Sequence, residues 1–121
     1  MLRRILLQVL ALALVACAQP VPVTATRLQA LDAPADELRI SRDTVVHLST
    51  GRNRLLPAGS RWRAVGALPQ GVVYQPVDTV FIIVGSQVHE AWLVVRGGAV
   101  QGFYLPGESN FSPLSPPLNL P

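Results

Sequence analysis

Metal binding or acid–base chemistry would most readily involve the two histidines and the acidic residue beside one of them. His89 is followed directly by Glu90, and His47 lies in a separate apolar stretch. Successive residues of a strand point to opposite faces, so His89 and Glu90 cannot hold one metal ion together or act as a catalytic pair. His47 could approach His89 in space, but two histidines without patterned cysteines or carboxylates make a poor metal set. We therefore expect structural histidines and no metal site.

The residues that other catalytic mechanisms require are not arranged for them in this sequence. The serines fall in expected turns or in the C-terminal tail, and none lies in a Gly-x-Ser-x-Gly turn. No spaced pair of carboxylates favours glycoside hydrolysis, and no phosphate-cradling loop is present. We expect no catalytic residue, no cofactor and a protein that is not an enzyme. A small hydrolase that joins a histidine to a serine remains a lesser alternative.

Half of the arginines beyond the N-terminal segment fall between residues 52 and 63. They are Arg52, Arg54, Arg61 and Arg63, and Trp62 stands between two of them. Arginine binds phosphates and carboxylates through paired hydrogen bonds. If the four arginines lie on one side of the domain, they could therefore bind lipopolysaccharide phosphates or acidic groups of the cell wall. The other interpretation is a solvated strand face that protects an edge, with Trp62 in the core. We expect this second arrangement and keep anion binding as the alternative.

The only cysteine, Cys17, ends a short apolar N-terminal segment. Arg3 and Arg4 give a basic start, and the apolar run 5–16 follows them. As a helix this run would be about 18 Å long, which is too short for a hydrocarbon core of roughly 30 Å. A basic start, a short apolar run and small residues at the end are typical of a secretory signal peptide rather than a membrane span.

The tetrapeptide Leu14-Val15-Ala16-Cys17 resembles the lipobox of bacterial lipoprotein precursors. The resemblance implies cleavage after Ala16, a thioether-linked diacylglycerol on Cys17 and often a further acyl chain, such as palmitate, on the new amino group. Two or more acyl chains anchor a protein stably, whereas one anchors it marginally. Cys17 has no disulfide partner in the chain. In Gram-negative lipoproteins an aspartate after the cysteine retains the protein in the inner membrane, so Ala18 implies the outer membrane and a domain facing the periplasm.

Removal of the signal peptide changes the charge of the chain. The formal net charge is +3, but Arg3 and Arg4 leave with residues 1–16, and the mature chain has eight arginines against seven acids. Such a balance gives no reason to expect a nucleic-acid partner. The expected partners are the membrane, through the lipid on Cys17, and another protein of the cell envelope.

The mature chain is expected to have three parts. Prolines discourage regular structure in residues 17–37, which predicts a tether after the lipidated cysteine. Residues 38–114 carry the strand patterns of one small β domain. Residues 115–121 form a proline-rich tail that is expected to be extended.

Six stretches rich in apolar and β-branched residues predict the strands of the β domain: 38–50, 60–68, 72–77, 79–84, 88–95 and 99–105. In the strand 60–68, alternation places Trp62, Ala64 and Leu68 on one face. The run 79–84 is apolar on both faces and is expected to lie centrally in the sheet. The last pair, 88–95 and 99–105, is predicted to form a hairpin, because Gly97-Gly98 can adopt the positive φ of a tight turn.

These patterns predict an all-β fold of five to six strands, either a small antiparallel barrel or a two-layer sheet, with an SH3-like barrel as the leading expectation. The stretches 56–62 and 92–106 are similar to small uncharacterised lipoproteins of proteobacteria, and that resemblance implies no activity. The function we expect is that of a lipid-anchored, non-enzymatic accessory or partner-binding protein of the envelope. A lipid-anchored lysozyme inhibitor is a lesser alternative, because those small β-barrels usually carry a disulfide.

Overall fold

The computed structural model describes residues 19–33 and 36–121, so the expected signal peptide (1–16) and Cys17 lie outside the described residues. The described part is all-β, as predicted, and its strands pair antiparallel. None of it forms a helix long and apolar enough to cross a membrane. In chain order the strands are β1 (Thr24–Ala25), β2 (Glu37–Arg39), β3 (Thr44–Val46), β4 (Arg54–Leu56), β5 (Arg61–Leu68), β6 (Gly71–Pro76), β7 (Ile82–Val84), β8 (Val88–Glu90), β9 (Trp92–Arg96), β10 (Ala99–Leu105) and β11 (Asn110–Asn119).

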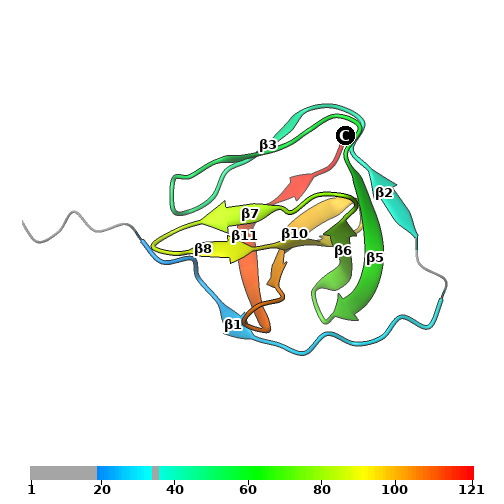
Figure 1. The fold of residues 1–121 in the computed structure, drawn as a ribbon, viewed down its shortest axis with the longest axis horizontal. Helices are drawn as coiled ribbons and strands as arrows, with labels where there is room; N and C mark the ends of the chain where they lie inside the picture. The colour runs from blue at the N-terminus through cyan, green and yellow to red at the C-terminus, as the bar shows by residue number, and fades with distance from the viewer. Residues whose placement is uncertain (1–18, 34–35) are drawn as a thin grey trace, which may run out of the picture.

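Seven of these strands form one twisted sheet in the order β1-β11-β10-β9-β6-β5-β2 (Figure 1). Two further hairpins, β3–β4 and β7–β8, are separate two-stranded sheets. The described strands outnumber the predicted five to six because several contain only two or three residues. Segments this short carry too few residues for an alternating pattern to be recognised in the sequence.

The main core lies between the sheet and the two hairpins. It joins Trp62 of β5 and Phe103 of β10 to Val46, Leu56 and Ile83 of the hairpins, and all five side chains are almost fully buried. Phe81 links the two layers through its ring. The ring centre lies 5.4 Å from that of Trp62, which it meets edge-on, and 6.1 Å from that of Phe103, on which it stacks. Such aromatic pairs add to the hydrophobic burial that holds the layers together.

A second apolar cluster lies on the opposite side of the sheet. Tyr104 and Phe111 are buried there, and Leu28 and Trp92 pack against them. Leu28 belongs to the segment 26–33, which runs beside β5 through an isolated bridge between Gln29 and Ala67. Both faces of the central strands are therefore covered, which explains their nearly continuous apolar sequences.

The predicted glycine hairpin is confirmed in its inner part. Trp92 pairs with Tyr104 and Arg96 with Ala99, and Gly97 and Gly98 take φ values of 59° and 74°. The first arm is shorter than predicted, because Val88–Glu90 pairs with β7 instead. The expectation that 79–84 lies centrally in the main sheet was therefore wrong, since its strand residues form the β7–β8 hairpin over the main core.

A β-bulge in β5 overturns the predicted face of one residue. The strand has an extra residue, Val65, between the pairs Ala64–Tyr74 and Gly66–Val73. One inserted residue reverses the side on which all later residues point. As a result Trp62 lies in the main core, whereas Leu68 lies in the second cluster.

The expected tether and tail are both built into the fold. Within 19–33, β1 pairs with β11, and Val21 is only 8% exposed. At the other end of the chain, β11 runs to Asn119. The β structure thus extends on both sides of the predicted domain 38–114, because extended, proline-containing segments can add strands at a sheet edge.

Candidate functional site

The histidine and its acidic neighbour in sequence have different partners. His89 Nδ1 lies 2.9 Å from Glu108 Oε1, whereas Glu90 accepts a hydrogen bond of 3.1 Å from Trp92 Nε1. The two residues of the His89-Glu90 pair therefore act separately, as the strand geometry predicts. Within 19–33 and 36–121, no three residues among histidines, cysteines and acids gather closely enough to hold a metal ion.

The surroundings of Tyr74 change the pKa of its hydroxyl. Burial raises the pKa of its hydroxyl, and the carboxylate of Asp36 raises it further. Both effects favour the neutral phenol, because burial disfavours any charged form and the Asp36 carboxylate repels a negative charge on the phenolate. At neutral pH Tyr74 therefore remains a protonated, partly buried side chain of β6.

The structure separates the arginines that lie close in sequence. Arg52 is exposed in the turn between β3 and β4, while Arg61 and Arg63 are exposed at the start of β5. The length of β4 lies between Arg52 and the other two. The guanidinium of Arg54 stands over the ring of Phe81, 5.1 Å from its centre. The four arginines thus do not form one patch.

Arg61 is already engaged by two acids. Its guanidinium lies 3.5 Å from the carboxylate of Glu37 and 3.4 Å from that of Asp78. About half of the Arg61 side chain and half of the Glu37 side chain are exposed. Trp62, in contrast, is only 2% exposed and donates a hydrogen bond of 3.2 Å to Ser60 Oγ. Five residues were candidates from the sequence for anion or partner binding: the four arginines and Trp62. Trp62 is a residue of the main core.

A cleft of about 310 Å³ lies where β4, β5 and the segment before β7 meet. We call it the arginine cleft. Arg54 and Arg61 stand beside it, Trp62 and Phe81 contribute to its apolar lining, and Val80 lies at its rim with 67% of its surface exposed. The combination of exposed apolar surface and guanidinium groups suits a ligand or peptide with an apolar part and a negative charge.

Apolar surface continues from the arginine cleft onto the outer side of the β3–β4 hairpin. Val45 and Leu55 are directly opposite each other in its register and are 44% and 46% exposed. Adjacent exposed aliphatic side chains of this kind are typical of protein contact surfaces. Sequence analysis did not identify them, because a short run of aliphatic residues does not show which of its side chains will be exposed.

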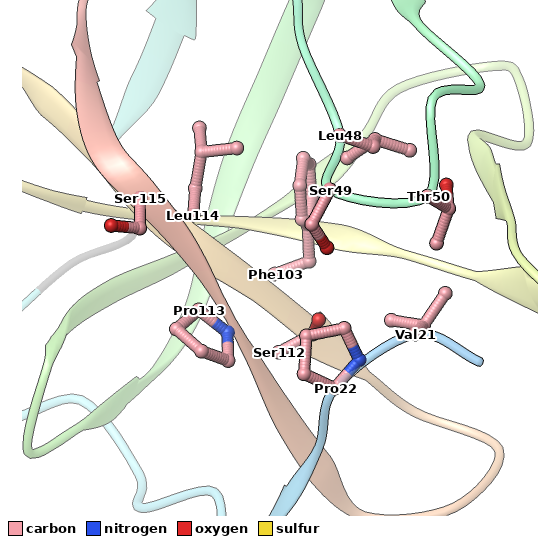
Figure 2. Close-up of a pocket in the computed structure, with 10 residues that line it drawn as sticks. All are labelled: Val21, Pro22, Leu48, Ser49, Thr50, Phe103, Ser112, Pro113, Leu114 and Ser115. Carbon is pink, nitrogen blue, oxygen red and sulfur yellow. The ribbon is translucent and has the colours of Figure 1, made fainter. Parts of the chain in front are cut away.

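A second pocket, of about 130 Å³, lies beside the first described residues (Figure 2). We call it the N-terminal pocket. Val21 and Pro22 line one side, Leu48 to Thr50 of the β3–β4 turn line another, and Ser112 to Ser115 of β11 complete it over Phe103. Sequence reasoning missed this pocket because it treated residues 17–37 as a tether. Its walls come from three segments that are distant in sequence.

Comparison with known proteins gives this chain no relative from which a function could be carried over. It matches no protein-family model, no curated protein and no solved structure.

Proposed function

We propose that this chain is a lipid-anchored, non-enzymatic protein of the bacterial cell envelope, placed at the outer membrane with its β domain facing the periplasm. The observation that carries the proposal is the position of the only cysteine, Cys17, directly after Leu14-Val15-Ala16. A basic start and an apolar run of signal-peptide length precede it. Acyl chains at this position anchor a protein to a bilayer without a spanning helix.

The biochemical role we propose is the binding of an envelope protein partner. It is supported by the exposed aliphatic side chains of Val45, Leu55 and Val80 around the arginine cleft. The central parts of protein interfaces are more apolar than the rest of the surface, and arginine is enriched in interfaces. The partner surface would then consist of the arginine cleft and the outer side of the β3–β4 hairpin.

Replacing Cys17 with serine is expected to abolish acylation and to release the protein from the membrane fraction. Serine keeps the size of the residue but has no thiol to form the thioether. Mass spectrometry of the purified protein would measure the acyl chains, and membrane fractionation would measure retention. A Cys17→Ser protein that is still acylated and still sediments with the outer membrane would contradict the proposal.

The neighbouring residue provides a matched control for this experiment. Ala18→Asp leaves Cys17 in place, so acylation is expected to continue. By the resemblance to Gram-negative lipoproteins, the acylated protein should then move from the outer to the inner membrane fraction. Unchanged outer-membrane retention of Ala18→Asp would remove the support for the outer-membrane location while leaving the anchor itself intact.

A second candidate function is the binding of anionic envelope ligands, such as lipopolysaccharide or the cell wall, at the arginine cleft. It is favoured by Arg54 and Arg61 at the cleft and by Arg63, which lines a connected depression with Asp78. The acids that already pair with Arg61 weaken the positive potential there. We therefore place anion binding behind protein binding.

The double variant Arg61→Gln/Arg63→Gln is expected to lower binding to lipopolysaccharide about tenfold at low salt, if anions occupy the cleft. The difference should shrink as salt screens the charges. Arg27→Gln/Arg42→Gln is a control with the same loss of charge on exposed residues outside the cleft. Equal binding by the two double variants in a low-salt pull-down would exclude the cleft as the anion site.

A further inference from the structure

The first described residues are seated against the β7–β8 hairpin. Val21 is 8% exposed, and a Cβ placed on Gly85 would lie 2.8 Å from the Val21 backbone nitrogen and 2.9 Å from the Gln19 carbonyl oxygen. Only a glycine permits so close an approach of two backbones. The chain is therefore fixed to the domain from about residue 19 onward.

This seat lies very near the proposed lipid anchor. Cys17 precedes Val21 by four residues. A fully extended chain spans at most about 3.6 Å per residue, so Cys17 lies within about 14 Å of Val21. An anchor of this length keeps the domain close to the bilayer and decides which end of it is turned toward the lipid.

Three segments form the end of the molecule from which this anchor leaves. They are residues 19–23, the β3–β4 turn (48–53) and the β7–β8 turn with its flanking residues (84–88), which lie together at the left of Figure 1. Thr50 Oγ1 donates a hydrogen bond of 2.8 Å to the Val84 carbonyl and joins the two turns. We call these three segments the anchor end.

The composition of the anchor end suits a lipid surface. It contains no acidic residue, and its single charged side chain is the exposed Arg52. Val23 and Val88 are 47% and 63% exposed there. Arginine close to a bilayer is attracted by anionic lipid headgroups, and small exposed apolar side chains are tolerated at the interface.

We propose that the anchor end lies directly on the bilayer, with Arg52 at the lipid phosphates, and that the arginine cleft is turned away from the membrane. This inference rests on the proposed acylation of Cys17 and deepens it, because it assigns a membrane-contacting face. In Figure 1 the β4–β5 connection, which borders the cleft, lies at the end of the molecule opposite the anchor end. The cleft is thereby presented to partners in the periplasm.

Spin labels on the mature acylated protein, which begins at Cys17, would test this orientation. Single cysteines would be introduced as Asn53→Cys and Gln87→Cys at the anchor end and as Ala58→Cys beside the cleft, since all three positions are exposed. The vesicles would contain phosphatidylcholine, phosphatidylglycerol and a lipid whose headgroup carries a chelated paramagnetic ion. We expect relaxation enhancement at Asn53 and Gln87 to exceed that at Ala58 at least threefold.

The outcomes separate the inference from the proposed function. Equal enhancement at the three positions in an acylated, vesicle-bound protein would overturn the orientation and leave the lipid anchor standing. A protein without acyl chains by mass spectrometry would overturn the proposed function itself, and the orientation with it.

A glycine variant tests the short anchor independently. In Gly85→Leu the new side chain displaces residues 19–22 and thereby frees the chain that leads to Cys17. We expect the protein to stay vesicle-bound while the enhancement at Asn53 falls to the level found at Ala58. Gly107→Leu is the control, because no atom lies within 4 Å of a Cβ there. Full enhancement retained in Gly85→Leu would overturn the inference.

Discussion

A Gly102→Ala protein is expected to lose about 3 kcal/mol of its free energy of unfolding, which is a large share of the stability of a small domain. A Cβ at this position would collide with the Ser112 carbonyl oxygen and would lie 2.9 Å from the ring of Phe111. The first neighbour is the backbone of the paired strand, so it cannot turn aside as a flexible side chain would. The β10–β11 ladder must therefore shift. Urea denaturation followed by far-UV circular dichroism would measure the loss.

Gly107 provides the control for this substitution. It lies in the turn that follows β10, and no atom comes within 4 Å of a Cβ built there. Gly107→Ala is expected to change the free energy of unfolding by less than about 0.5 kcal/mol. A Gly102→Ala protein as stable as Gly107→Ala would contradict the close packing of β10 on β11.

The β-bulges in β5 and β10 explain why the positions of strands were easier to predict than the side of the sheet on which each residue lies. In β10 the extra residue Gln101 places Val100 on the same side as Phe103, whereas simple alternation places them on opposite sides. Gln101 donates hydrogen bonds of 3.3 Å to the Arg96 and Ala99 carbonyls, and the contact with Arg96 exists only once the hairpin has closed. The sequence did contain an indication, because a glycine follows each bulge residue and a glycine within a strand often marks a bulge.

Prolines were a good indicator of extended chain and a poor indicator of disorder. Pro116 and Pro117 fall where β11 skips its pairing with β10, between the pairs Gly102–Pro113 and Val100–Leu118. A residue without an N–H is tolerated where the ladder is interrupted. Whether an extended segment docks depends on surfaces that distant residues form. Gly66 is an example, because the space above it accommodates the side chain of Leu28. The sequence around residue 28 does not reveal that this space exists.

The grouping of the arginines could not be decided from their spacing. Arg52 and Arg54 are two residues apart, yet a turn and a strand give them different surroundings: exposure for the first and the ring of Phe81 for the second. Arg61 finds Glu37 because β2 pairs with β5, a contact between segments distant in sequence. Side-chain type therefore predicted the chemistry of each residue, whereas only the topology determined its neighbours.

Replacing Trp62 with alanine is expected to cost about 3–5 kcal/mol of the free energy of unfolding, because it empties the centre of the main core. The indole is 2% exposed, contacts Phe81 edge-on and donates its N–H to Ser60. Trp62→Phe should cost less, since it keeps an aromatic ring against Phe81 and loses chiefly the hydrogen bond and part of the volume. Denaturation followed by far-UV circular dichroism measures both, because it does not depend on the tryptophan that is removed.

The neighbouring arginines separate a core role of Trp62 from a binding role. Arg61→Ala and Arg63→Ala are expected to change the free energy of unfolding by less than about 0.5 kcal/mol each, because exposed ion pairs contribute little. If Trp62 is a core residue, partner or ligand binding by Trp62→Phe should follow the folded fraction alone. A Trp62→Phe protein with unchanged stability and lost binding would contradict this. The surface that recognises the partner would then include the indole, and the cleft floor would have to open before binding.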